Sequence, residues 1–299
     1  MPGLHKGKED KMVWTLINIE ISKMFRKPRT YLGFIGAAII PLTVIIIFSY
    51  KDPTSFVAKI LGEMFTLSGS ILNGYLVSLV TINHASINFF LPVLVVLVVG
   101  EIVAGEEQEG TLRLILSRPV NRAYFLLSKL ISALIYTFLL VLIMVIVGLG
   151  GGLLVFDKGS LLVSGLLLGD EGWFNILNSA EAMRRLLMVY GGAFLVILTI
   201  TFMCFFLSSI LKNPIGAMIF PLILVIFLQI ISSFPFFSEI KPYLFTTYMD
   251  LWVDILAPEI PWKDILNSGL ILLSHSLLFI IGSFYYFTRK DILGSVNLK

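Results

Sequence analysis

The chain has 299 residues, of which 57% are apolar and only 14% are charged, and its mean hydropathy is +0.94. Soluble domains carry about 25% charged residues, so this composition excludes an ordinary soluble protein and indicates an integral membrane protein with several spans. A net charge of +3 is too small to indicate a nucleic-acid partner. The single cysteine, Cys204, excludes an intramolecular disulfide.

Residues 11–27 are expected to form an amphipathic helix that lies in the membrane interface. Its apolar residues recur at helical spacing: Val13, Leu16, Ile17, Ile21 and Met24. Basic side chains on such a helix meet anionic lipid headgroups, and Pro28 is expected to end it. The alternative is a solvated basic tail. No short apolar core with a cleavage site follows the first basic residues, so we expect no signal peptide.

Six segments are long and apolar enough to cross ~30 Å of hydrocarbon, which takes roughly 20 residues. The expected spans cover about residues 31–49, 87–103, 124–147, 190–211, 215–233 and 269–287. Gly148 and Gly150–Gly152 are expected to loosen the outer end of the third span. We therefore expect residues 1–299 to form a single, all-α transmembrane domain.

The segments between the spans differ in character. Residues 67–83 are apolar but rich in Ser, Gly and Asn, so we expect them to be interfacial or packed against protein rather than spanning. Residues 157–188 are expected to form a polar external segment. Pro242, Pro258 and Pro261 rule out one continuous helix over residues 234–268, so short outer-surface helices are expected there. Their headgroup anchors are expected to be Tyr243, Tyr248, Trp252 and Trp262.

The distribution of charge predicts the orientation. Six spans place both termini on one side. Fifteen of the 22 basic residues lie in the termini, in residues 105–129 and at Lys212, whereas the three opposite loops hold seven of them and eleven of the 19 acids. Because short basic loops stay in the cytoplasm, we expect a cell-membrane protein whose termini and 105–129 segment are cytoplasmic. If residues 67–83 spanned the membrane, the basic N-terminus and residues 105–129 would lie on opposite sides.

Residues 105–122 are expected to form a charged hairpin between the second and third spans. Three glutamates precede a short helical pattern, 111–117, which Pro119 ends. Acids before a helix and basic residues after it complement the helix dipole. The alternative is a stop-transfer loop whose charges only set topology, but topology requires neither three glutamates nor an apolar helical face. Lys129, two turns into the third span, is expected to reach back to the interface.

This hairpin resembles the signature of type-2 ABC transporter permeases. The resemblance is carried by Gly105-Glu106, by Glu109-Gly110-Thr111-Leu112-Arg113-Leu114-Ile115-Leu116-Ser117-Arg118-Pro119-Val120-Asn121-Arg122 and by Lys129. Glu20 and Arg26, ahead of Pro28-Arg29-Thr30-Tyr31, resemble the connecting helix of that family. The resemblance implies a coupling helix that inserts into a cleft of an ATP-binding subunit. The coupling residues that it implies are Gly105, Glu106, Glu109, Gly110, Thr111, Arg113, Ser117, Arg118, Pro119 and Arg122.

No G-x-x-x-x-G-K-[ST] phosphate loop occurs in the sequence. We therefore expect a non-enzymatic permease without cofactor or metal, driven by ATP that binds a separate ATPase subunit. The resemblance implies two permeases, identical or related, and two ATPases in an exporter. It also makes residues 234–268 compatible with re-entrant helices.

Polar residues at membrane depth are few, and Gln229 and His275 are the candidates for lining a transport path. The alternative is that neighbouring helices satisfy them. A mostly apolar interior favours a lipid-like or amphipathic cargo, or transmission of force to another protein. Two other functions stay open: a membrane anchor or force-transmitting subunit of an ATPase-driven complex, and a secondary transporter. A secondary transporter would need ionisable residues within the membrane.

Overall fold

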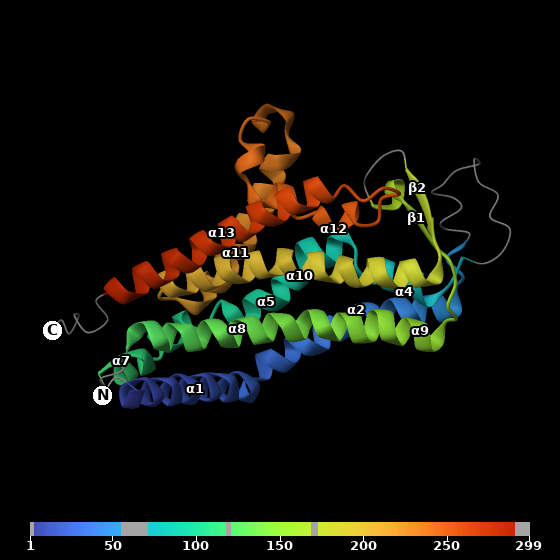
Figure 1. The fold of residues 1–299 in the computed structure, drawn as a ribbon. Coiled ribbons are helices and arrows are strands. Elements are labelled where there is room, and N and C mark those ends of the chain that lie inside the picture. The colour runs from blue at the N-terminus through green and yellow to red at the C-terminus, as the bar shows by residue number, and fades with distance from the viewer. Residues whose placement is uncertain (1–2, 55–70, 118–120, 169–172, 291–299) are drawn as a thin grey trace.

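The protein is an all-α, multi-pass membrane protein, as its composition predicts. The computed structural model describes residues 3–54, 71–117, 121–168 and 173–290. Within these residues, six helices are long and apolar enough to cross a membrane, and each overlaps one predicted span (Figure 1). They cover Pro28–Tyr50, Ser86–Gln108, Arg122–Val155, Ser179–Ile210, Pro214–Ser233 and Trp262–Arg289.

Several of these spans are built from more than one element. The first half of the chain forms α1 (Gly3–Arg26), α2 (Pro28–Tyr50), α4 (Gly74–Thr81), the π-helix η1 (Ser86–Phe90), α5 (Leu91–Val99), α6 (Ala104–Gln108) and α7 (Thr111–Leu116). The middle forms α8 (Arg122–Met144), the π-helix η2 (Val145–Gly151), α9 (Gly152–Val155), β1 (Leu161–Ser164), η3 (Gly165–Leu168) and β2 (Phe174–Leu177). The last part forms α10 (Ser179–Ile210), α11 (Pro214–Ser233), the 3-10 turns η4 (Pro235–Phe237), η5 (Lys241–Tyr243) and η6 (Phe245–Tyr248), α12 (Leu251–Asp254) and α13 (Trp262–Arg289).

The two ends of the helix bundle carry different structures. At the hairpin end, on the left in Figure 1, α6 and α7 lie beside α1 and the end of α13. Arg122 Nη1 donates there to the carbonyl oxygen of Lys290 at 2.9 Å. At the sheet end, β1 and β2 pair antiparallel, with Leu161 opposite Leu177. This small sheet was not predicted, because its two strands of four residues each are too short to show a clear alternation of apolar and polar side chains.

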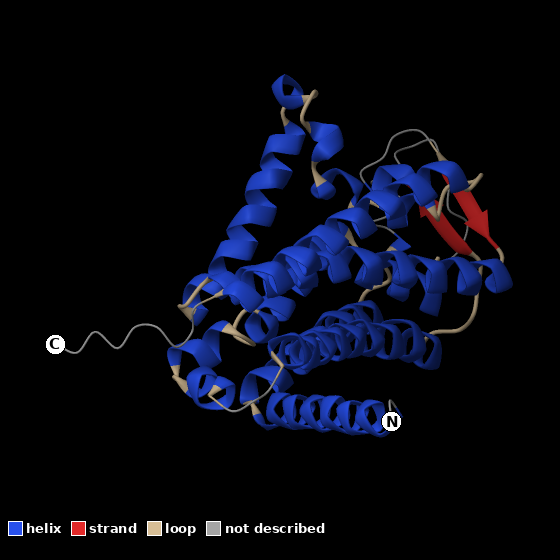
Figure 2. Ribbon diagram, turned by 60° about the vertical axis from the view of Figure 1, so that its left-hand side comes forward, coloured by secondary structure: helices blue, strands red, loops and turns tan. Residues whose placement is uncertain are grey.

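The N-terminal helix α1 lies at the hairpin end and runs obliquely to the spans. In Figure 1 the first turn of α1 is at the left end of the helix, whereas in Figure 2 it is at the right end. The end of α13 lies on the left in both views, so α1 is not parallel to the spans. The helix begins at Gly3, earlier than the predicted residue 11. It ends before Pro28, which is the first residue of α2, and Lys27 between them is extended.

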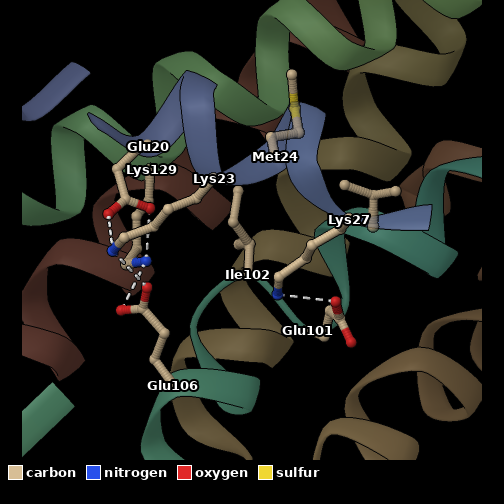
Figure 3. Close-up of a pocket in the computed structure, with 9 residues that line it drawn as sticks. Glu20, Lys23, Met24, Lys27, Glu101, Ile102, Glu106 and Lys129 are labelled. Carbon is tan, nitrogen blue, oxygen red and sulfur yellow. Dashed lines mark hydrogen bonds and ion pairs between the residues drawn. The ribbon is translucent and has the colours of Figure 1, made fainter. Parts of the chain in front are cut away.

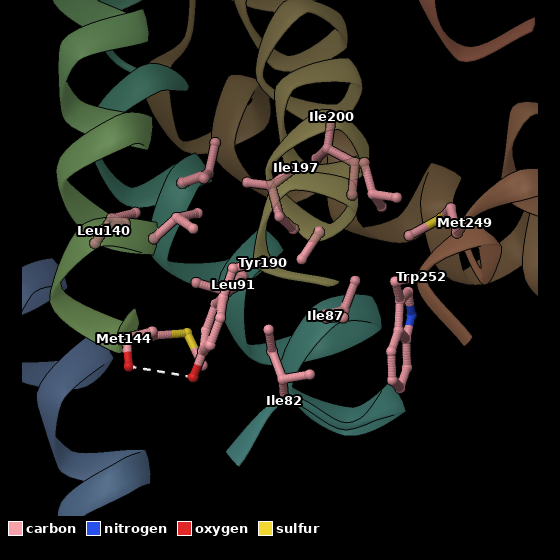
Figure 4. Close-up of a cluster of buried hydrophobic side chains, with 14 of the residues drawn as sticks. Ile82, Ile87, Leu91, Leu140, Met144, Tyr190, Ile197, Ile200, Met249 and Trp252 are labelled. Carbon is pink, nitrogen blue, oxygen red and sulfur yellow. Dashed lines mark hydrogen bonds between the residues drawn. The ribbon is translucent and has the colours of Figure 1, made fainter. Parts of the chain in front are cut away.

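Helix α10 is the central element of the bundle. It packs on α5, α8, α11 and α13, and its residues form much of the apolar core shown in Figure 4. Trp252 lies in this core with its side chain fully buried. The prediction of Trp252 as a headgroup anchor is therefore wrong, because α12 packs this residue against the core rather than toward the membrane interface.

The sheet end also corrects the predicted end of the third span. The glycines after Met144 lie in η2 or directly follow it, so the span leaves α geometry there and continues as a π-helix before α9 extends it to Val155. They permit close packing against α4: a Cβ on Gly152 would lie 2.8 Å from the carbonyl oxygen of Gly74. Helix α4 itself is almost wholly buried, so the described part of residues 67–83 is packed against protein.

Residues 179–188, predicted as part of an external segment, instead form the first turns of α10. Asn178 caps this helix, since its side chain accepts a hydrogen bond from the Glu181 backbone N–H at 3.0 Å. Asparagine is a preferred N-cap residue, so the local sequence explains why α10 begins here. The first turns of α10 were not predicted because their residues are polar, whereas the spans were predicted from apolar segments.

Candidate functional site

The charged hairpin, residues 105–122, turns at a glycine and presents a short helix at the end of the bundle. Gly110 has φ +73°, a left-handed conformation that glycine adopts without strain, and α7 begins at the next residue. Among the described residues, no atom outside Gly110 and its two chain neighbours lies within 4 Å of a Cβ placed on Gly110, so the backbone angle is what favours glycine there. Thr111 Oγ1 donates to the Glu106 carbonyl oxygen at 3.2 Å and closes the turn.

The hairpin has one buried face and one exposed face. Leu112 is fully buried, whereas Leu114 is 71% exposed. The exposed face is formed by Gln108, Glu109, Arg113, Leu114 and Ser117. At its base, the backbone N–H groups of Val103 and Ala104 both donate to Ser208 Oγ of α10 at 3.2 Å. The hairpin is therefore anchored to the central helix and exposes its tip.

A buried ionic cluster joins the hairpin to α1 and α8 (Figure 3). The Lys129 ammonium lies 2.8 Å from Glu20 Oε2 and 2.8 Å from Glu106 Oε2. The Lys23 ammonium lies 2.7 Å from Glu20 Oε1 and 3.0 Å from Glu106 Oε1. Two carboxylates and two ammonium groups thus alternate in a closed, electrically balanced arrangement. We call these four residues the ionic cluster.

Burial makes this pairing necessary. The side chains of Lys129 and Glu20 are only 1% and 5% exposed, and an isolated charge at such a position would carry a large desolvation cost. Lys23 is 40% exposed, so it is partly solvated. Burial lowers the pKa of Lys23, but the hydrogen bond with Glu20 and the charge of Glu106 outweigh burial and hold that pKa above its ordinary value of 10.5. Lys23 therefore stays charged at neutral pH.

Further ion pairs surround this cluster. Lys27 Nζ lies 3.0 Å from Glu101 Oε1, and Arg29 contacts the other oxygen of the same carboxylate. Lys290, at the end of α13, donates to Glu107 Oε2 at 2.5 Å and to the Ser209 carbonyl oxygen at 3.2 Å. A cavity of about 30 Å³ between α1 and the hairpin base is large enough for one water molecule. Side chains from α1, α8 and α13 thus all bind the base of the hairpin.

The predicted coupling residues differ in their positions on the hairpin. Glu109, Arg113 and Ser117 lie on the exposed face. Gly105 is buried, Glu106 belongs to the ionic cluster, and Arg122 Nη1 donates to the carbonyl oxygens of Thr288 and Lys290. Gly110 and Thr111 form the turn between α6 and α7. Arg118 and Pro119 lie outside the described residues.

The prediction for Lys129 is wrong. Its side chain does not reach back to the interface, because Glu20 and Glu106 meet it inside the protein and the Phe125 ring lies 4.9 Å from its ammonium. The role of Glu20 was also missed. A signal was present: Ile17, Glu20 and Met24 share one face of α1, and all three are buried. An acid on an apolar helical face indicates a buried partner of opposite charge.

The two candidate path-lining residues both contact the segment between α11 and α13. Gln229 Nε2 lies 3.9 Å from Met249 Sδ. His275 Nδ1 and Nε2 lie 2.9 Å and 3.2 Å from the carbonyl oxygens of Ile271 and Tyr243. Each side chain is half-buried and has a partner within the chain, so the contacts of neither residue indicate a transport path. Among the described residues, no group of three His, Cys, Asp or Glu side chains is placed to hold a metal ion.

The fold and this site define a multi-pass membrane protein with an anchored, charged hairpin at one end of its bundle. The chain belongs to the family described as "Protein of unknown function (DUF2705)", whose family model matches residues 34–293. It is similar to "Uncharacterized protein YhcI" of Bacillus subtilis (strain 168), with 27% identity over 224 residues. That alignment covers 73% of this chain and 70% of the relative.

Proposed function

We propose that this protein is the membrane-spanning permease subunit of an ATP-driven exporter, and that the charged hairpin couples it to a separate ATPase subunit. The observation that carries the proposal is the contrast within the hairpin. Its tip exposes Leu114, Arg113 and Glu109, whereas its base is bound by buried ion pairs to α1 and α8. An exposed tip on a fixed base suits a part that receives force from a partner.

The contacts at the base would transmit that force. A displacement of α7 acts on the hairpin base through Leu112 and the turn at Gly110. Ser208 links the base to α10, and the ionic cluster links it to α1 and α8. Because close-packed helices move as rigid bodies, closure of an ATPase pair on two such hairpins would tilt the spans and open a path between two permeases.

The same proposal includes an orientation and a cargo class. The excess of basic residues at the hairpin end supports a cytoplasmic position for that end in the cell membrane, where ATP and the partner ATPase are available. ATP would bind the partner, since the sequence has no phosphate loop. The apolar core favours a lipid-like or amphipathic cargo.

Co-purification tests the proposal. The tagged full chain is extracted from its native membranes in mild detergent, and mass spectrometry searches for an equimolar chain that carries a phosphate loop. Leu114→Glu is expected to reduce recovery of that chain about tenfold or more, because burial of a leucine at an interface contributes about 1.5–3 kcal/mol.

Ile176→Glu is the matched control, because Ile176 is 72% exposed and lies in β2 at the opposite end. It should leave recovery unchanged. Absence of any phosphate-loop ATPase from the wild-type preparation, or equal loss in both variants, would contradict the proposal.

A further inference from the structure

His84 joins three segments at the sheet end. It follows α4, and its Nδ1 lies 3.0 Å from Asp250 Oδ1, in the connection between α11 and α13. Its Nε2 lies 2.6 Å from the carbonyl oxygen of Leu168, the last residue of η3. The ring also packs against Trp252, with 5.1 Å between ring centroids. A single side chain thus links α4, the turn after β1 and the segment that precedes α12.

Both nitrogens of His84 face groups that accept hydrogen bonds. A backbone carbonyl and an ionised carboxylate have no proton to donate, and a neutral imidazole has only one N–H. Only the imidazolium form donates to both oxygens. At 2.6 Å from Leu168, a nitrogen lone pair would face an oxygen lone pair at less than an ordinary hydrogen-bond distance. The protonated ring therefore satisfies both contacts at once, which a neutral ring does not.

We propose that His84 is a proton-dependent clasp that holds the connection between α11 and α13 against the sheet end. When the proton leaves, the remaining N–H serves either Asp250 or Leu168, and the other contact is lost. In either case, the link that runs from residues 245–254 through His84 to the turn after β1 has one hydrogen bond fewer. This inference does not depend on the proposed partner ATPase.

The groups around His84 also favour its protonated form. The hydrogen bond with Asp250 is the largest influence and raises the pKa of His84 above its ordinary value of 6.5; the Leu168 carbonyl adds to this, and burial opposes it. Asp254 and Tyr248 line the same cavity, of about 320 Å³, and Asp254 adds a second acid there. Asp170 and Glu171, which follow Leu168 in the sequence, lie outside the described residues.

The raised pKa of His84 determines how the stability of the clasp depends on pH. A group whose pKa is higher in the folded than in the unfolded state contributes stability that is fully present below the unfolded value. That contribution is lost as the pH rises through the folded value. The clasp is therefore closed in acid and opens as the pH rises above about 6.5.

Spin-label distances measure the clasp directly. Labels at Ile176→Cys and Tyr243→Cys, which are 72% and 77% exposed, report the separation between β2 and the α11–α13 connection. The native Cys204 is fully buried and can remain. In the full chain, reconstituted in lipid nanodiscs, we expect one narrow distance distribution at low pH. It should broaden with a midpoint above about 6.5.

Three variants test the assignment. His84→Asn keeps one donor without the titration and should remove the pH dependence. Asp250→Asn should move the midpoint down toward about 6.5, and this shift is decisive even if His84→Asn fails to fold. Asp264→Asn, an exposed acid in the first turn of α13, is the matched control and should leave the midpoint unchanged. A pH-independent wild type, or an unchanged midpoint in Asp250→Asn, overturns the proposal.

Discussion

Replacement of Lys129 by methionine is the sharpest test of the ionic cluster. Methionine has a similar length but no charge. Its introduction leaves Glu20 and Glu106, which are 5% and 12% exposed, with only the partly solvated Lys23. Removal of one partner from a buried ion pair costs about 3–5 kcal/mol. At about 2–4 °C per kcal/mol for a large domain, the melting temperature should fall by roughly 6–20 °C.

The single cysteine offers the assay. Cys204 lies fully buried in α10, so a maleimide dye reacts with it only when the bundle opens. Lys212→Met is the matched control, because Lys212 is exposed in the turn before α11, and it should leave the melting temperature unchanged. The double variant Glu20→Gln/Lys129→Met removes both buried charges of one pair. We expect it to be more stable than the sum of its single variants predicts.

Two results would refute this reasoning. The first is a Lys129→Met protein that melts with the wild type. The second is strict additivity in the double variant, which would mean that Glu20 and Lys129 do not act on each other. A charge-reversed Lys129→Glu protein should be less stable than Lys129→Met, because it places three carboxylates beside Lys23.

The same assay checks two further substitutions. Gly110→Ala should cost about 1–2 kcal/mol, because alanine disfavours φ +73° although the site has space for a Cβ; a cost near zero would mean that the turn is not needed. Trp252→Phe should cost less than about 1 kcal/mol, since it removes a buried Nε1–H that has no partner among the described residues and so offsets the small cavity left. Trp252→Ala should cost about 3–5 kcal/mol, and equal costs for the two Trp252 variants would contradict this account.

Local features of the sequence predicted most of the secondary structure. The six spans are evident because a run of about 20 apolar residues has few other uses. Pro28 was predicted to end the N-terminal helix, and α1 does end before it. Gly110 and Asn178, which the secondary-structure prediction did not use, are residue types that favour a turn and an N-cap, and each has that place. The predictions for two side chains were wrong because their exposure was inferred from their position in the sequence. Trp252 lies in a polar connection yet is buried, and Lys129 lies near a membrane boundary yet has its partners inside the protein.

The membrane class, the six helices and the charged hairpin could be predicted from the sequence, because hydrophobic length and local charge do not depend on long-range contacts. Which charges meet depends on how the helices pack. Lys129 and Glu20 are separated by 109 positions, Lys23 and Glu106 by 83, and His84 and Asp250 by 166. Such pairs form only after the helices pack. A charged group that packing removes from water then needs a partner of opposite charge or a hydrogen-bond acceptor, and packing decides which residue lies beside it.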